Sequence, residues 1–196
     1  MLHPKLYGLI LSGGKSTRMG SDKGMLEYHG KPQRDYLFEL CEQLCDGVYY
    51  SIQESQEKAF ANKPTIVDQN EFRGPFNGML SAHKKHKDAA WLVLACDLPL
   101  IDKLTISQLI KERDTTKNAT SFATNKTKLP EPLITIWEPN GLAKAYEYMQ
   151  TAESSCPRKF LLNSEIKLVF PKEDTVLYNA NSLEEYNYAK KLLNNG

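Results

Sequence analysis

The chain reads Leu11-Ser12-Gly13-Gly14-Lys15-Ser16-Thr17-Arg18-Met19-Gly20-Ser21-Asp22-Lys23 directly after an apolar segment, Leu6–Leu11. Consecutive glycines let backbone N–H groups turn toward an anion, because no Cβ stands in the way. Lys15, Arg18 and Lys23 add three cations within nine positions. A basic, glycine-rich loop after a strand therefore predicts a site for a triphosphate.

This loop follows neither of two common nucleotide-binding patterns. A Walker A loop that ended in Gly14-Lys15-Ser16 would need its first glycine at position 9, which is leucine. The Rossmann pattern Gly-x-Gly-x-x-Gly is also absent from the loop. On the loop alone, a glycine-rich surface turn with incidental basic residues stays open as the alternative.

A carboxylate follows a second apolar segment, Trp91–Ala95, in the sequence Cys96-Asp97-Leu98-Pro99. Pro99 ends strand pairing, so Asp97 is expected at the end of a strand and at the same sheet edge as the glycine loop. Asp97 could hold Mg²⁺ against phosphate oxygens, because Mg²⁺ prefers hard oxygen ligands. The alternative is that Asp97 only caps the next turn, but the nearby basic loop favours metal-assisted phosphate chemistry.

Short apolar segments alternate with helical patterns along the chain. The patterns predict strands at Leu6–Leu11, Val48–Ile52, Thr65–Val67, Trp91–Ala95, Thr120–Ala123, Leu133–Trp137, Lys167–Phe170 and Val176–Tyr178. They predict helices at Gln33–Leu44, Glu54–Ala61, Asn77–His86, Lys103–Arg113, Gly141–Gln150, Pro157–Leu162 and Leu183–Leu193. Such alternation is typical of βαβ crossovers. We expect one α/β domain over residues 1–196, with a mostly parallel sheet covered by helices on both faces.

The composition is that of an ordinary globular domain. Lys and Arg number 25 and Asp and Glu 24 in 196 residues, so the net charge of +1 gives no reason to expect nucleic acid or an anionic membrane as partner. The longest apolar run, Ala89–Cys96, is far shorter than the roughly 18 residues that span a bilayer. The first residues lack the pattern of a signal peptide, and we expect a cytoplasmic protein.

Cysteine and histidine give little sign of a zinc site. The cysteines are widely spaced except for Cys41 and Cys45, which lack a second Cys or His pair nearby, so we expect reduced thiols. His83 and His86 could share a helix face, but the lysines around them indicate a solvated helix end rather than a metal site.

The two anchors at this separation resemble nucleotidyltransferases built on a Rossmann-like sheet, and among them the molybdenum cofactor guanylyltransferase (MobA) family. That family opens with Leu-Ala-Gly-Gly, three variable residues, Arg-Met-Gly, one or two residues and Asp-Lys. Further matches are Gly74-Pro75-Phe76-Asn77-Gly78 to Gly-Pro-Leu-x-Gly, Cys96-Asp97-Leu98-Pro99 to Cys-Asp-x-Pro, and Asn179-Ala180-Asn181 to Asn-x-Asn. The departures at Ser12, Phe76 and Ser182-Leu183 remove no functional group. The resemblance implies a three-layer α/β/α nucleotidyltransferase domain.

The resemblance also implies an activity, which is the Mg²⁺-dependent transfer of GMP from GTP to molybdopterin. The products would be molybdopterin guanine dinucleotide and pyrophosphate. Transient contact with molybdenum cofactor biosynthesis proteins or molybdoenzyme chaperones would fit this activity. Two other interpretations stay open: a related enzyme that uses CTP or another phosphate acceptor, and a non-catalytic adaptor that binds GTP or the cofactor.

Roles carry over to single residues by the same resemblance. The nucleotide would be contacted by Leu11, Ser12, Gly13, Gly14, Lys23, Ser51, Asp68 and Asp97. Among these, Ser51 and Asp68 match positions that contact guanosine, and Ser51 stands where the family usually has asparagine. For Asp68, a cap at the end of a strand stays open as the alternative. Catalysis would depend on Arg18, Lys23 and Asp97: Arg18 would hold phosphates, Lys23 would stabilise the leaving pyrophosphate, and Asp97 would bind Mg²⁺.

The acceptor side has fewer candidates. Arg158 is the best of them, because a guanidinium binds phosphate with two parallel hydrogen bonds. A solvated helix start stays open as the alternative for this residue. Asn179 and Asn181 could orient the acceptor, or could only tie the last helix to the sheet. The stretch 115–129 is the least similar to the family and leaves acceptor specificity open.

Overall fold

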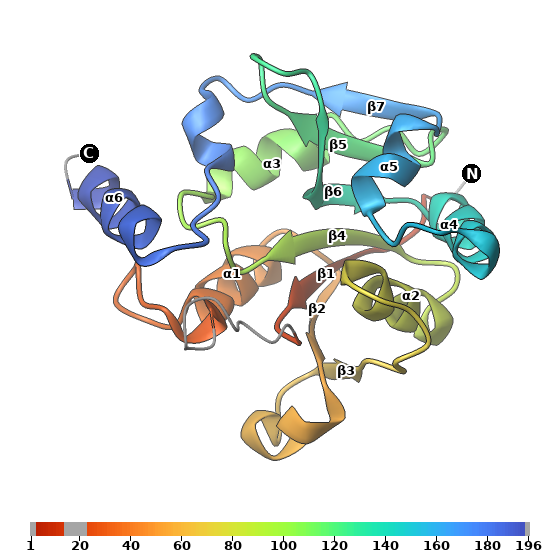
Figure 1. The fold of residues 1–196 in the computed structure, drawn as a ribbon, viewed down its shortest axis with the longest axis horizontal. Helices are drawn as coiled ribbons and strands as arrows, with labels where there is room; N and C mark the ends of the chain where they lie inside the picture. The colour runs from red at the N-terminus through yellow and green to blue at the C-terminus, as the bar shows by residue number, and fades with distance from the viewer. Residues whose placement is uncertain (1–2, 14–22, 195–196) are drawn as a thin grey trace.

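A seven-stranded sheet forms the centre of the protein in the computed structural model, which describes residues 3–13 and 23–194 (Figure 1). The strands are ordered β3 (Thr65–Val67), β2 (Gly47–Ile52), β1 (Leu6–Leu11), β4 (Ala90–Ala95), β6 (Pro130–Trp137), β5 (Ala119–Ala123) and β7 (Ile166–Val169). β6 runs antiparallel to β4 and β5, and the other neighbours pair in parallel. The expected α/β fold with a mostly parallel sheet is confirmed.

Helices cover both faces of the sheet. One face carries α1 (Gln33–Glu42) and α3 (Lys103–Lys111), and the other carries α2 (Pro75–Lys85), α4 (Pro139–Thr151) and α5 (Pro157–Leu162). Every residue of β4 is buried, because a strand in the middle of such a sheet meets helices on both sides. This explains why β4 is a continuous apolar run rather than an alternating one.

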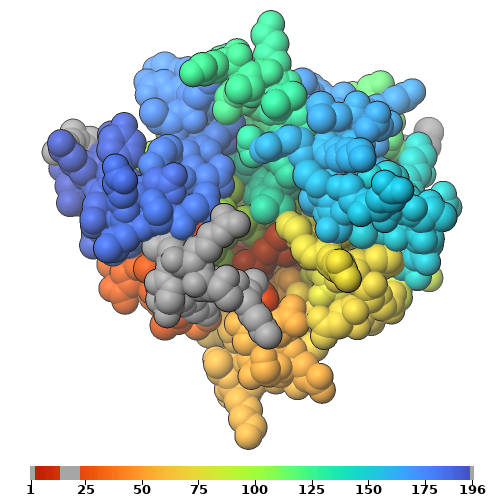
Figure 2. Space-filling view, viewed as in Figure 1, coloured from red at the N-terminus to blue at the C-terminus, as the bar shows by residue number. Residues whose placement is uncertain are grey.

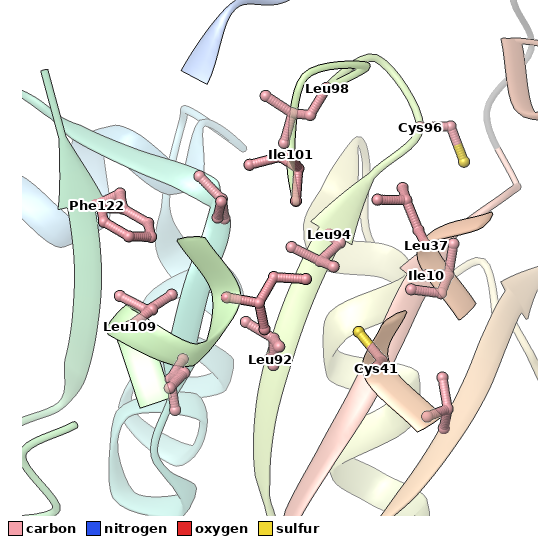
Figure 3. Packing of buried hydrophobic residues seen from close by; sticks show 14 of the residues in the cluster. Ile10, Leu37, Cys41, Leu92, Leu94, Cys96, Leu98, Ile101, Leu109 and Phe122 are labelled. Atoms are coloured by element: carbon pink, nitrogen blue, oxygen red, sulfur yellow. The ribbon is translucent and has the colours of Figure 1, made fainter. Parts of the chain in front are cut away.

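Two apolar clusters hold the layers together. On the first face, Ile10 and Leu94 of the sheet pack with Leu37 of α1 and Leu109 of α3 (Figure 3). On the second face the cluster is rich in aromatic rings, with Phe76, Trp137 and Phe160 in mutual contact. Burial of these side chains is the main driving force for packing the helices on the sheet.

The last helix, α6 (Leu183–Asn194), packs over the chain that follows η1 (Lys23–Met25) rather than over the sheet. Tyr28 and Ala189 form the centre of this small contact, and the Tyr28 and Tyr186 rings lie 4.9 Å apart. The Ser182 hydroxyl accepts a hydrogen bond from the Glu185 N–H at 3.2 Å and so caps the helix. No helix among residues 3–13 and 23–194 is long and apolar enough to cross a membrane.

The helix expected at Glu54–Ala61 is present as the 3₁₀ helix η2, Glu54–Phe60. Two other local expectations were wrong. The segment 176–178 is not a strand: Asp174–Leu177 forms the 3₁₀ helix η3, and the Tyr178 N–H bonds locally to the Thr175 carbonyl. His83 is buried at 8% exposure rather than solvated, because α2 buries most of its length against the sheet.

The parallel register brings the carboxyl ends of four strands to one edge. Leu11 lies opposite Ser51 of β2 and Ala95 of β4, and Ser51 lies opposite Ile66 of β3. The residues that follow these strands therefore meet at this edge, where open α/β sheets bind their ligands.

A buried ion pair closes the opposite end of the molecule. Arg113, after α3, donates to both carboxylate oxygens of Glu138 at 2.6 and 2.8 Å and also to the Pro4 carbonyl at 3.2 Å. Their side chains are only 12% and 2% exposed. A charge this deeply buried depends on its partner.

We expect Arg113→Met to lower the free energy of unfolding by about 3–5 kcal/mol, because it leaves the Glu138 carboxylate buried without its counter-ion. Urea denaturation measures the change. The matched control is Lys31→Met, which breaks the exposed pair with Glu39 and should change stability by no more than about 1 kcal/mol. Equal effects of the two substitutions would contradict a structural role for the buried pair.

Candidate active site

A cavity of about 450 Å³ opens at the carboxyl edge of the sheet. It is visible as the hollow between the orange residues that follow β2 and the yellow residues at the start of α2 (Figure 2). Its floor is formed by the ends of β1, β2 and β4, and Leu133 of β6 lines another side. Of the predicted nucleotide contacts, the cavity brings together Leu11, Gly13, Ser51 and Asp68.

Asp68 is the buried charged group of this cavity, with 6% of its surface exposed. The Ser51 hydroxyl donates to Asp68 Oδ1 at 2.7 Å, and the Gln53 amide donates to Asp68 Oδ2 at 2.9 Å. Burial raises the pKa of the Asp68 carboxyl, and hydrogen bonds from Ser51, Gln53 and Asn77 act against that rise. The carboxylate is thus held by neutral donors.

Two glycines make room for this carboxylate. A Cβ on Gly13 would lie 2.9 Å from Asp68 Oδ2, and a Cβ on Gly78 would overlap the Ser51 hydroxyl oxygen. Any larger residue at either position would displace a partner of Asp68. Gly13 and Gly78 therefore serve close packing at this point.

Asn70, Phe72 and Gly74 line one wall of the cavity, and the segment 69–74 is fixed to α2. The Gln69 N–H donates to the Ser81 hydroxyl at 2.9 Å, and the Asn77 amide donates to the Asn70 side chain at 3.3 Å. Gly74 has a φ of 66°, a left-handed conformation that favours glycine, and it turns the chain into Pro75 at the start of α2.

A second polar cluster lies at the same sheet edge, after β4. Lys23 Nζ lies 3.6 Å from Asp97 Oδ2 and donates to the Asn181 side-chain oxygen at 2.5 Å. The Ala180 N–H donates to the Asp97 carbonyl at 2.9 Å, which brings the C-terminal segment to this edge. Burial raises the pKa of the Asp97 carboxyl, and the nearby Lys23 charge opposes that rise.

The Asp97 carboxylate fits one ligand of a magnesium ion. Its Oδ1 atom is buried and has no hydrogen-bond partner among the described residues. Within residues 3–13 and 23–194, no group of three or more His, Cys, Asp or Glu side chains could hold a metal ion. Mg²⁺ is commonly bound by one or two carboxylates with substrate phosphates and water, so a single carboxylate is compatible with it.

Each acceptor candidate has its own hydrogen-bond partners in this structure. Arg158 donates to both oxygens of Glu131 at 2.8 Å and to the Pro130 carbonyl at 2.9 Å, so its guanidinium is already paired in this structure. Asn179 donates to the Leu177 carbonyl at 3.3 Å. Asn181, in contrast, joins Lys23 in the cluster described above.

Two predicted residues, Gly14 and Arg18, lie outside the described residues. The neighbouring Ser12 is buried, and its N–H donates to the Ser51 carbonyl at 2.9 Å. Sequence reasoning missed Gln53 and Asn77 as partners of Asp68. The place of Gln53 directly after a strand was the available signal, since residues there meet at the ligand-binding edge.

We expect Gly78→Ala to destabilise the protein by about 1–3 kcal/mol, because the new methyl group must displace the Ser51 hydroxyl. Alanine in a helix would otherwise stabilise it by about 1 kcal/mol, so the expected sign is opposite to helix propensity. Urea denaturation measures the effect, and Ser51→Ala in the same chain should restore part of the loss. An increase in stability on Gly78→Ala alone would show that the contact is not constraining.

Comparisons with known proteins show the family to which the chain belongs. The MobA-like NTP transferase domain family matches residues 8–166. A molybdenum cofactor guanylyltransferase of Pseudomonas fluorescens is 31% identical over 180 residues, which cover 90% of this chain and 89% of that protein. A molybdenum cofactor biosynthesis bifunctional protein of Synechocystis is 34% identical over 92% of this chain, but the match spans only 52% of that protein's length.

A solved structure shows the same fold. It is the molybdopterin-guanine dinucleotide biosynthesis protein A of Archaeoglobus fulgidus, with a TM-score of 0.78 over 97% of this chain and 100% of that chain. Its sequence identity to this chain is 14%, so the likeness concerns the arrangement of helices and strands alone.

Proposed function

Because the chain belongs to the MobA-like NTP transferase family and is thus a nucleotidyltransferase, we propose that it transfers GMP from GTP to molybdopterin. The products are molybdopterin guanine dinucleotide and pyrophosphate. The observation that supports this proposal is the pair of carboxylates at one sheet edge, Asp68 among neutral donors and Asp97 beside Lys23.

Asp68 reads the base in this proposal. Guanine presents an N1–H and a 2-amino group as neighbouring donors, and adenine lacks this edge. A carboxylate offers about four lone-pair positions, so the three side chains that bond Asp68 leave capacity for a base donor. Ser51 contributes by fixing Oδ1 of Asp68 and by lining the cavity.

Lys23 and Asp97 act at the phosphate end. The Lys23 ammonium stabilises the charge that grows on the leaving pyrophosphate, with Asn181 holding it by a hydrogen bond. Asp97 would hold Mg²⁺, which when bound neutralises charge on phosphate oxygens. Transfer then depends mainly on positioning and charge stabilisation, since a phosphate oxygen of the acceptor is already an adequate nucleophile.

The acceptor contacts belong to the same proposal. Asn181 is the candidate nearest to Lys23, and Asn179 lies two positions before it. Arg158 would have to exchange Glu131 for an acceptor phosphate. The Ser155 hydroxyl lies 3.7 Å from the position of a Cβ on Gly74, so the segment before Arg158 borders the cavity wall.

Equilibrium binding of GTP, ATP, CTP and UTP, each with and without Mg²⁺, tests the nucleotide. We expect clear preference for GTP with Mg²⁺, followed by pyrophosphate release when molybdopterin is added. Preference for CTP would assign the chain to cytidylyl transfer, and binding without turnover would favour an adaptor.

We expect Asp97→Asn to keep the fold and to lose turnover by about 100-fold or more, because it removes a charged contact to the metal and phosphates. Steady-state pyrophosphate release at saturating Mg²⁺ measures this loss. The matched control is Asp88→Asn, which makes the same change at an exposed position after α2. Unchanged turnover in Asp97→Asn would remove Asp97 from the catalytic group.

We expect Asp68→Asn to weaken GTP binding by about 1–3 kcal/mol and to affect ATP and CTP much less, since it turns one acceptor into a donor. Calorimetric titration of the three nucleotides measures the difference. Equal weakening of all three would mean that Asp68 supports the cavity without reading the base.

A further inference from the structure

We propose that Gln53 is a positioning residue that sets the nucleotide preference of the cavity by fixing the orientation of Asp68. The inference rests on the proposed function, because it concerns how the base-reading carboxylate is held. Gln53 was not among the residues expected from the sequence, and it lines the cavity beside Asp68.

Gln53 and Ser51 divide the two oxygens of the carboxylate between them. Ser51 donates to Oδ1 at 2.7 Å and Gln53 donates to Oδ2 at 2.9 Å. With a donor on each oxygen, and Asn77 as a third side chain that donates to the same carboxylate, the plane of the carboxylate is fixed. Without Gln53, Oδ2 loses that donor, and the group can turn about its Cβ–Cγ bond, a broad and roughly two-fold torsion. The lone pairs that face the cavity then lose their fixed direction.

Gln53 is itself held in place. Its backbone N–H donates to the Gln56 side-chain oxygen at 2.8 Å, and the Gln56 N–H donates to the Gln53 carbonyl at 2.9 Å. The Gln56 amide also donates to the Ser12 carbonyl at 3.1 Å. The start of η2 thus connects the base-reading carboxylate with the first loop.

The absence of charge on the Gln53 side chain matters as much as its length. Hydrogen bonds from a neutral amide satisfy Asp68 and keep its negative charge available for a base donor, whereas a lysine would neutralise it. Gly13 packs against the same pair: a Cβ there would lie 3.2 Å from Gln53 Nε2 and 2.9 Å from Asp68 Oδ2. The pair therefore has little room to rearrange.

The substitutions Gln53→Glu and Gln53→Met separate the effect of an added negative charge from the effect of a lost hydrogen bond. The glutamate loses the amide donor and puts a second carboxylate against Asp68, which disfavours two ionised groups at this distance. The methionine keeps the length of the side chain and removes the donor only. We expect GTP affinity to fall about ten-fold or more in Gln53→Glu and several-fold in Gln53→Met, with ATP affinity nearly unchanged.

The matched control is Gln150→Glu. It adds the same charge at an exposed side chain near the end of α4, outside the cavity, and should leave nucleotide preference as it is. Equilibrium binding of GTP and ATP with Mg²⁺ to the wild type and the three variants gives the preference. Steady-state kinetics should show a raised KM for GTP with kcat nearly unchanged, because Gln53 lies at the base end and not at the phosphate end.

The outcomes separate the two proposals. A wild-type chain without preference for GTP overturns the proposed function. A wild-type chain that prefers GTP, with both Gln53 variants keeping that preference, overturns only the positioning role. Equal losses of GTP and ATP affinity, or a loss in kcat without a change in KM, also overturn it. If Gln53→Glu does not fold, Gln53→Met carries the test alone.

Discussion

A carboxylate buried at the end of a sheet must be given hydrogen bonds, and this requirement organises the cavity around Asp68. Its donors come from the end of β2, from the residue after it, and from the first turn of α2. Gly13 and Gly78 have no Cβ, and a Cβ at either position would press on this group of side chains. The close approach of the first loop, two strand ends and one helix start is therefore one connected arrangement, in which a change at any member reaches the others.

The C-terminal segment completes the other end of the site through a different kind of contact. Lys23 reaches the Asn181 side chain, and the Ala180 N–H bonds to the Asp97 carbonyl. These contacts join residues far apart in the sequence. The helix α6, which lies at one side of the molecule (Figure 1), keeps them in place by packing on Tyr28 and its neighbours. The proposed phosphate end therefore depends on a helix that contributes little to the sheet core.

Much of the fold and part of the site could be predicted from sequence. β1 and β3 were predicted with their observed bounds, and β4 to within one residue, because buried parallel strands are short apolar runs followed by polar residues. The strand expected at 176–178 has a similar composition but satisfies its backbone locally in η3, a tertiary outcome that composition does not reveal. The pairing of Arg158 with Glu131 and the hydrogen bond from Gln53 to Asp68 were also hidden, since both depend on side chains that meet only after the sheet has formed.

Burial disfavours the charged form of both carboxylates at this edge, and different neighbours oppose the effect in each. Burial raises the pKa of both Asp68 and Asp97. A cation, Lys23, acts against that rise at Asp97, whereas the hydrogen bonds that act against it at Asp68 come from neutral side chains. A cationic neighbour suits the proposed site for phosphates and a metal ion, because the positive charge of Lys23 balances the negative charge of Asp97. Neutral donors suit a place that receives an uncharged base, because they leave the carboxylate's charge as the feature that selects a donor edge.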